Sequence, residues 1–314
     1  MNPWNNLNNW NPLNNKTIKT ITTHIVPEGI TNIRLQDYAK VVFKPFLFSG
    51  QGAKKAIKRG NVLVNGAVAL TGYWIQPGDI IELRESAETP PKIFELPLEI
   101  IYEDEHLAVI NKPSGIPVSG NQFKTIRNAL LFNLERSKDE DALTWPKPVH
   151  RLDAPTSGLL LIARTNLASI ALGQQFEAKS IQKKYHAIVI GKTPDHGHWD
   201  SPVNGQSAYT EYKTLESVPS LKNKWISLLE LWPKTGRTHQ IRIHLSEAGY
   251  PIMGDKIYGT EGKVMKGKGL FLASTGLMFR HPTFNKKMII EIEIPYKFRS
   301  LLDREKRRWK KYDP

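Results

Sequence analysis

The sequence predicts an α+β protein, in which a large, mainly antiparallel mixed sheet is flanked by helices and a small α/β module precedes it. Short apolar strands outnumber the helical segments, and several strands are joined by hairpin-like turns. The few helices are well separated along the chain. A chain of 314 residues with 40% hydrophobic side chains is long and apolar enough for two ordinary domains.

Changes of composition divide the chain into four parts. Residues 1–15 are rich in Asn and of low complexity, so we expect a mobile tail. Residues 16–87 form the predicted small module, and the proline-rich residues 88–97 form a predicted linker. Residues 98–314 form the predicted larger domain.

The small module is expected to contain two helices and a few short strands. Apolar residues at helical spacing predict one helix near 35–42 and another near 53–57, and strands are predicted from 16 to 26, at 62–64 and at 80–83. The turns are Asn65-Gly66 and Pro77-Gly78-Asp79. The second helix carries a basic cluster that would suit a phosphate backbone, and the alternative is a solvated helix face. The cluster consists of Lys54, Lys55, Lys58 and Arg59.

The larger domain alternates predicted strands with few helices. One helix is expected after Thr125, which would cap it, and others at 167–179 and 239–248. Strands are predicted at 99–102, 107–111, 158–163, 185–191, 209–215, 225–231, 270–272 and 288–294.

Charge and cysteine content limit the classes of function that the protein can have. A formal net charge of +14 is typical of proteins that bind a polyanion, most simply nucleic acid. The absence of cysteine excludes disulfides, iron–sulfur clusters and thiolate nucleophiles, so covalent chemistry must use carboxylate, hydroxyl, lysine or histidine groups. No segment has the pattern of a membrane span or a signal peptide, and we therefore expect a cytoplasmic protein.

A polar, turn-rich segment at 150–158 leads directly into an apolar strand. Its side chains would lie at the edge of the sheet, where clefts usually form. Asp153 is the candidate nucleophile within it, and the alternative is a turn or capping residue. Thr156 and Ser157 have a similar alternative as hydroxyls that cap the backbone.

A second polar cluster occupies 236–244. If Thr238 caps a helix, His239, Arg242 and Ser246 share one face, and Gly249 ends the helix. The alternative is an ordinary amphipathic helix with a charged rim. His239 and His244 are five positions apart rather than four, and the pair His196 and His198 lacks a suitable set of partners, so we expect no metal site.

These segments together resemble the RluA family of RNA pseudouridine synthases, and the stretch from 33 to 83 resembles the S4 RNA-binding domain. The resemblance spans roughly 95–295. The matching motifs are Asn-Lys-Pro-Ser-Gly at 111–115, His-Arg-Leu-Asp at 150–153, Thr-Ser-Gly-Leu-Leu at 156–160, Lys-Tyr-His-Ala-Ile-Val-Ile-Gly at 184–191, Ala-Tyr-Thr-Glu-Tyr at 208–212, Gly-Arg-Thr-His-Gln-Ile-Arg at 236–242 and Gly-Asp-X-X-Tyr-Gly at 254–259.

The resemblance implies roles for individual residues. Asp153 would be the essential carboxylate, Tyr185 the ring that packs on the target base, and Arg242 the guanidinium paired with the carboxylate. Burial in a dry pocket favours a neutral carboxyl group, so an opposed arginine is needed to keep this one charged. Further residues are expected to contact RNA or the substrate. They are His150, Arg151, Thr156 and Leu272, together with the basic cluster on the second helix of the small module.

This sequence departs from the family pattern at two places. Ala154-Pro155 replaces a usual charged pair, and Leu272-Ala273-Ser274 replaces a usual Leu-His-Ala. In the small module, Gly52-Ala53-Lys54-Lys55 stands where the S4 domain often has Ser-Arg. These departures bear on RNA choice and loop contacts.

We therefore expect an enzyme that isomerises specific uridines of structured RNA to pseudouridine. Ribosomal RNA is the first expectation and tRNA the second, with no cofactor, no metal, no membrane partner and a monomeric state. One alternative is a non-catalytic RNA chaperone, and another is a retaining glycoside hydrolase that pairs Asp153 with Asp255. The basic run at 306–311 is interpreted as a solvated helix end, and the alternative is an extension of the RNA-binding surface.

Overall fold

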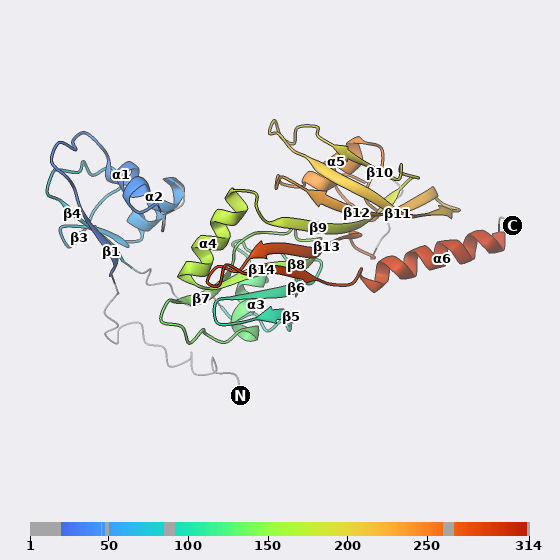
Figure 1. The fold of residues 1–314 in the computed structure, drawn as a ribbon, viewed down its shortest axis with the longest axis horizontal. Coiled ribbons are helices and arrows are strands. Elements are labelled where there is room, and N and C mark those ends of the chain that lie inside the picture. The colour runs from blue at the N-terminus through green and yellow to red at the C-terminus, as the bar shows by residue number, and fades with distance from the viewer. Residues whose placement is uncertain (1–19, 45, 48–49, 85–91, 260–266, 313–314) are drawn as a thin grey trace. The chain divides into compact units, whose positions relative to one another are not determined.

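The computed structural model describes residues 20–44, 46–47, 50–84, 92–259 and 267–312 (Figure 1). The chain separates into two compact units, Met1–Pro90 and Pro91–Pro314. The Asn-rich tail predicted for 1–15 lies outside the described residues, as do residues 88–91 of the predicted linker. No helix in the described ranges is long and apolar enough to cross a lipid bilayer.

The N-terminal unit packs two helices on a sheet with strand order β1-β4-β2-β3. Its core is built from side chains of both helices and of the sheet, among them Leu35, Ile57 and Ile81. The hairpin between β2 and β3 turns at Asn65 and Gly66, both with positive φ, as the Asn-Gly pair predicts. The elements are β1 (Thr20–Ile25), α1 (Leu35–Val42), α2 (Gly50–Lys58), β2 (Val62–Val64), β3 (Ala67–Val68) and β4 (Ile80–Arg84).

Helix α2 has two chemically different faces. Ala53, Ala56 and Ile57 are buried, as their spacing predicts. Of the predicted basic cluster, Lys54, Lys55 and Lys58 are exposed on the helix, whereas Arg59, also exposed, follows its last residue rather than lying on it as predicted. The three lysines are therefore available to a polyanion.

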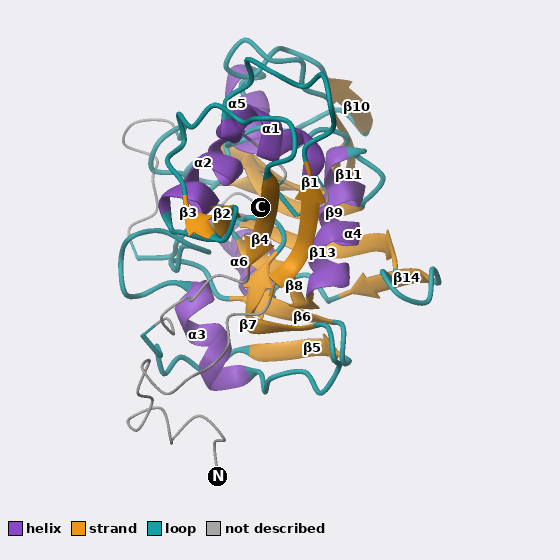
Figure 2. Ribbon diagram, turned by 90° about the vertical axis from the view of Figure 1, so that its left-hand side faces the viewer, coloured by secondary structure: helices purple, strands orange, loops and turns teal. Residues whose placement is uncertain are grey.

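The second unit is built on one long mixed sheet with the order β10-β11-β12-β9-β13-β8-β6-β5, in which β14 also pairs with β13 and β7 with β8. Figure 2 shows β13, β8, β6 and β5 of this sheet one beside the next, and the predicted α+β class with a large mixed sheet is confirmed. The strands are β5 (Glu99–Glu103), β6 (Leu107–Lys112), β7 (Ala142–Pro148), β8 (Ser157–Thr165), β9 (Gln182–Ile190), β10 (His196–Trp199), β11 (Thr210–Ser220), β12 (Lys224–Pro233), β13 (Leu272–Arg280) and β14 (Lys287–Glu291).

Helices of this unit pack on the sheet. Thr125 caps α3, because its side chain accepts a hydrogen bond from the Asn128 amide at 3.2 Å. Thr165 caps α4 in the same way through Ala168 N, also at 3.2 Å. The helices are α3 (Ile126–Asn133), α4 (Asn166–Glu177), α5 (Gln240–Glu247) and α6 (Tyr296–Tyr312), the last drawn in red in Figure 1.

Strands β8 and β13 join the two halves of the sheet. Their pairing is parallel, with Ala273 opposite Ser157 and Ser274 opposite Gly158, whereas the neighbouring pairs are antiparallel. Alternate residues of β8 are buried in different clusters, with Leu159 and Leu161 in one and Leu160 and Ile162 in the other. Both faces of the central sheet are therefore covered, and β8 holds the polar segment before it in a fixed position.

Some elements differ from the prediction. Strands β7 and β10 were not predicted, and β13 continues from the short predicted strand to Arg280. Helix α6 is longer than the predicted basic helix end. Its residue Glu305 is buried and accepts a 2.7 Å hydrogen bond from Ser220, so the helix packs on β11 rather than standing free in solvent.

Candidate active site

The polar segment before β8 is held by a buried lysine from the neighbouring strand. Lys112 is fully buried at the end of β6, and its Nζ donates to the carbonyl oxygens of Pro113, Ala154 and Thr156 at 2.8, 3.1 and 2.8 Å. Burial lowers the pKa of Lys112 to about 8. Because three backbone carbonyls meet at one ammonium group, the turn that directly follows Asp153 is tied to the end of β6 and has little freedom to move.

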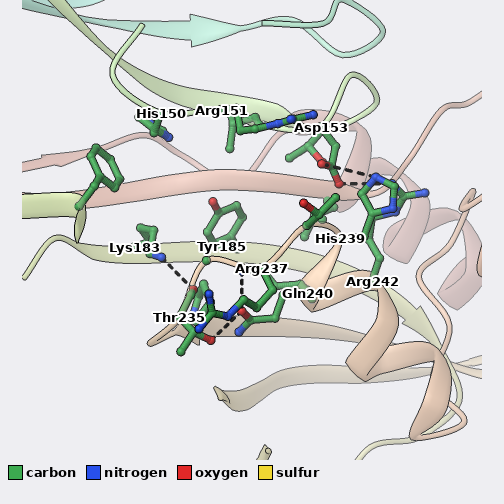
Figure 3. Close-up of a pocket in the computed structure, with 18 of the residues that line it drawn as sticks. His150, Arg151, Asp153, Lys183, Tyr185, Thr235, Arg237, His239, Gln240 and Arg242 are labelled. Atoms are coloured by element: carbon green, nitrogen blue, oxygen red, sulfur yellow. Dashed lines mark hydrogen bonds and ion pairs between the residues drawn. The ribbon is translucent and has the colours of Figure 1, made fainter. Parts of the chain in front are cut away.

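Asp153 faces two nitrogen-bearing side chains. Its Oδ2 accepts a hydrogen bond from Nη1 of Arg242 at 3.2 Å, and its Oδ1 lies 3.7 Å from Nε2 of His239 (Figure 3). The Asp153 side chain is 17% exposed, so the carboxylate is accessible to a ligand and is also held by the protein. The expected pairing of Asp153 with Arg242, across 89 positions of sequence, is therefore present.

A second carboxylate fixes the arginine. Nε and Nη2 of Arg242 donate to Oδ2 and Oδ1 of Asp255 at 2.7 and 2.8 Å, in the bidentate geometry that guanidinium groups favour. Burial acts to raise the pKa of Asp255, but the hydrogen bonds from Arg242 and from the amides of Ile257 and Tyr258 lower it overall. Arg242 is buried, which excludes the interpretation of α5 as a helix with a charged rim.

The geometry of Asp255 also argues against the hydrolase alternative. Asp255 is 1% exposed, and both of its oxygens accept hydrogen bonds from Arg242 or the backbone. A retaining glycoside hydrolase needs two carboxyl groups that both reach the sugar. Asp255 orients Arg242 instead.

Tyr185 of β9 and Leu272 of β13 line the same pocket as Asp153. Burial raises the pKa of Tyr185 to about 12, so its hydroxyl stays protonated at neutral pH. The ring is thus a neutral, flat surface beside the carboxylate. Leu272 is buried, and it adds apolar surface to the pocket wall.

The pocket has a volume of about 290 Å³ and continues past Tyr185 to a cation that sequence reasoning missed. Lys183 lies two residues before Tyr185 on β9, and its Nζ donates to the Thr235 carbonyl at 3.0 Å. Burial lowers the pKa of Lys183 to about 8. The one sign of Lys183 in the sequence is its place two residues before Tyr185, because a lysine within a strand has no distinctive pattern of its own.

The other predicted contact residues of this unit lie around the pocket with different exposure. Arg151 is exposed, and Thr156 is buried. His150 is used by the fold, since its Nε2 accepts a hydrogen bond from Leu161 N at 3.0 Å and its ring stacks on Phe176 at 4.7 Å. Burial lowers the pKa of His150 to about 3, so the ring is neutral. The four cations of the α2 basic cluster belong to the N-terminal unit.

The start of α5 differs from the prediction. Thr238 is not its cap, because the helix begins at Gln240 and its N-cap is His239, which has a left-handed backbone and makes no capping hydrogen bond through its side chain. Gly249 follows the helix with φ of 81°, as expected for a glycine at a helix end. The residues in the described ranges contain no group of three or more His, Asp or Glu arranged to hold a metal ion.

Comparison with known proteins identifies the family. The model of a family described as RNA pseudouridylate synthase matches residues 106–247. An RNA pseudouridine synthase of Aquifex aeolicus is 34% identical, over 81% of this chain and 88% of its own length. A ribosomal large subunit pseudouridine synthase D of Zymomonas mobilis is 36% identical, over 68% and 74%. The chain belongs to the RluA family of RNA pseudouridine synthases.

A solved structure agrees with this assignment. Human RNA pseudouridylate synthase domain containing 4 is 25% identical, with a TM-score of 0.53 over 66% of this chain and 92% of the human one. The protein is thus an RNA pseudouridine synthase, and the alternative of a non-catalytic RNA chaperone is wrong. The sequence motifs of this family that contain Asp153 and Arg242 are the segments that the fold brings together.

Proposed function

We propose that this pseudouridine synthase isomerises specific uridines of large-subunit ribosomal RNA, as a monomer in the cytoplasm, with Asp153 as the reacting carboxylate and no cofactor. The observation that carries the proposal is the contact between Asp153 and Arg242 at the wall of a pocket that also contains Tyr185. A carboxylate, a cation that keeps it ionised and a flat apolar ring meet there.

The chemistry matches these groups. Pseudouridine formation breaks the bond between ribose C1′ and uracil N1, joins C1′ to C5, and moves one proton from C5 to N1 through solvent or the enzyme. All other atoms of the product come from the uridine, so the reaction needs no group donor and no redox partner. A carboxylate that adds to the ribose, adds to the base or removes a 2′ proton must in each case be ionised. Arg242, itself fixed by Asp255, favours that form of Asp153.

Tyr185 is proposed to hold the detached uracil. Its hydroxyl is neutral at physiological pH, since burial raises its pKa to about 12, and the residue therefore offers a ring face rather than a phenolate base. The target uridine must leave its stack to reach the pocket, at a cost of a few kcal/mol. Contacts from exposed cations such as Arg151 would offset that cost.

The choice of RNA rests on the relatives. Several are named as synthases of the large ribosomal subunit, including one of Xanthomonas campestris that is 30% identical over 88% of this chain. The N-terminal unit is proposed to be an S4-like RNA-binding module. Its support is the exposed basic cluster on one face of α2, opposite a buried apolar face.

The test incubates the full chain with unmodified large-subunit ribosomal RNA and, separately, with unmodified tRNA. Pseudouridine is mapped by a reaction that marks it specifically, because the isomer has the same mass as uridine. We expect modification at a few positions of the ribosomal RNA. Modification of tRNA alone would contradict the choice of RNA, and release of free base or sugar would contradict isomerisation.

A further inference from the structure

His239 has a backbone conformation that the start of a helix does not require. Its φ and ψ are 59° and 17°, in the left-handed region that residues other than glycine seldom adopt. The side chain makes no capping hydrogen bond to α5, so helix capping does not explain the conformation. Left-handed residues of this kind gather at functional sites, where the surrounding structure stabilises them.

The ring of His239 lies between a tyrosine and the catalytic carboxylate. Nδ1 is 2.9 Å from the hydroxyl oxygen of Tyr258, and Nε2 is 3.7 Å from Oδ1 of Asp153. The His239 side chain is 26% exposed and lines the pocket that contains Tyr185. Oδ2 of the same carboxylate is bound by Arg242, so each oxygen of Asp153 faces a different side chain.

Tyr258 is itself fixed in place. Its amide donates to Oδ1 of Asp255 at 3.1 Å, and its carbonyl accepts from Oγ of Ser246 at 2.8 Å. The guanidinium carbon of Arg242 lies 5.1 Å from the centre of the Tyr258 ring. The hydroxyl therefore reaches Nδ1 from a position set by contacts with three residues, Asp255, Ser246 and Arg242.

This geometry selects one tautomer of a neutral His239. If Nδ1 carried the proton, the lone pair of Nε2 would point at a carboxylate oxygen, and the two would repel each other. If the Tyr258 hydroxyl donates to Nδ1, the proton sits on Nε2 and points at Asp153. The distance of 3.7 Å is longer than a hydrogen bond, and contacts of this kind commonly shorten when a substrate binds.

We propose that His239, held as the Nε2–H tautomer by the Tyr258 hydroxyl, is a positioning residue that fixes Oδ1 of Asp153 toward the substrate. The proposal rests on the proposed role of Asp153. His239 is then a second residue that holds the Asp153 carboxylate, because Arg242 binds only Oδ2.

Two amide variants separate this role from a merely structural one. In His239→Gln, the side-chain amide nitrogen lies where Nε2 lies and can donate to Asp153. In His239→Asn, the amide lies where Nδ1 lies, so it meets Tyr258 and leaves Oδ1 without a donor. Asn tolerates a left-handed backbone better than Gln, so a purely structural role predicts that the Asn variant is the more active.

Single-turnover rates on an RNA substrate test the proposal. We expect His239→Asn to lose about 10- to 100-fold in rate at saturating RNA with KM unchanged, and His239→Gln to retain more activity than His239→Asn. Equal rates for the two variants, or a more active Asn variant, would overturn the proposal. Asp153→Asn is assayed in parallel. If it turns over normally, the proposed function fails, whereas an inactive Asp153→Asn beside a fully active His239→Asn defeats only the role of His239.

A pH profile of Tyr258→Phe gives a second readout. The variant keeps the ring beneath Arg242 but no longer selects the tautomer. An imidazolium donates from both nitrogens whether or not Tyr258 selects a tautomer, so the variant should regain activity relative to the wild type in acid. A rate ratio that stays constant from pH 8 to pH 5.5 would contradict tautomer selection.

The ratio of the Tyr258→Phe rate to the wild-type rate separates the effect of His239 from the effects of its charged neighbours. Asp153 precedes β8, Arg242 lies on α5, and Asp255 and Tyr258 follow that helix. Arg151, Lys183 and Arg237 line the same pocket. Apart from the Tyr258 hydroxyl, these groups are present in both proteins, so a change of the ratio with pH reports on the loss of that hydroxyl.

Discussion

Three residues of the site could be assigned from sequence because they lie in recognisable motifs. Asp153, Tyr185 and Arg242 stand within the family segments, and the structure brings them to one pocket. The catalytic roles of the three remain proposals. The role of Asp255 was not predicted, and the residue appeared only in the hydrolase alternative, since its bond to Arg242 depends on how the segment after α5 folds back.

Lysines in the site show the limit of sequence reasoning at this scale. Lys112 and Lys183 are charged residues in strands, where a pattern predicts exposure as readily as burial. The structure buries Lys112 completely and leaves Lys183 partly buried. Their lowered pKa values follow from that burial and from no feature of the motif.

The burial of Lys183 predicts a pH dependence of stability. Burial lowers the pKa of Lys183 in the folded state to about 8, against 10.5 for the ordinary group. Between these values the unfolded chain binds a proton that the folded chain has released, so the free energy of unfolding rises with pH. Lys183→Met should remove part of that rise, at most about 1.4 kcal/mol per pH unit.

Urea denaturation of the two proteins at pH 7, 8, 9 and 10 measures the effect. Lys213, exposed on β11, provides the control, because Lys213→Met should follow the wild-type profile. A Lys183→Met profile parallel to that of the wild type through this range would contradict the prediction.

At the level of elements, strands with an apolar run or a clear apolar alternation were predicted, whereas β7 and β10 were not and β13 was predicted only at its start. Strand β8 reads as a continuous apolar run and was predicted nearly in full. Strand β13 contains Ser274, Thr275 and Gly276, all polar or small, and yet the first two are fully buried because helices and loops cover both faces of the sheet. Strand β10 is an edge strand, and β7 pairs with β8 outside the main strand order and in an irregular register, so neither shows a regular sequence pattern.

The parallel pair β8 and β13 predicts a sensitive glycine. A Cβ added to Gly158 would lie 2.0 Å from the backbone oxygen of Ser274, and its φ of 109° strains any other residue. Gly158→Ala should therefore separate the two strands and destabilise the protein by at least about 3 kcal/mol. Activity should fall with it, because this pairing begins directly after the segment that carries Asp153.

Gly173→Ala is the matched control for that change. Gly173 lies within α4 with open space around its added Cβ, so alanine there should be neutral or stabilise the fold by up to about 1 kcal/mol. Thermal unfolding measures both variants. A Gly158→Ala protein that melts with the wild type would show that the two halves of the sheet do not need this close approach.

For the whole molecule, the sequence predicted the fold class and the enzyme family, because composition and motif order are properties of the entire chain. The net charge of +14 predicts that RNA binding weakens steeply with salt. Which of the basic side chains contact the RNA and which stay solvated depends on the shape of the RNA. The protein sequence does not specify that shape.

Neutralising the basic face of α2 tests whether its lysines are among the cations that contact RNA. The triple variant Lys54→Gln, Lys55→Gln, Lys58→Gln should weaken RNA binding and reduce the slope of log affinity against log salt by up to about 2 to 3, with kcat unchanged. The measurement is a binding titration at several salt concentrations. It reports on the N-terminal unit as an RNA-binding module.

A triple variant of α6 controls for net charge. Arg307→Gln, Lys310→Gln and Lys311→Gln remove the same number of exposed cations from a helix end that we interpret as solvated. Its salt slope should stay close to that of the wild type. Equal losses for the two triple variants would mean that total charge, and not the α2 face, determines binding.

The most direct test of the account is the turnover of Asp153→Asn. The variant keeps the shape of the side chain and its approach to Arg242 but removes the negative charge that the proposed chemistry needs. Under single-turnover conditions we expect no pseudouridine in the time that the wild type needs for completion, and a Kd for RNA within about twofold of the wild type. Pseudouridine formation at a rate near that of the wild type would contradict the central role of this carboxylate.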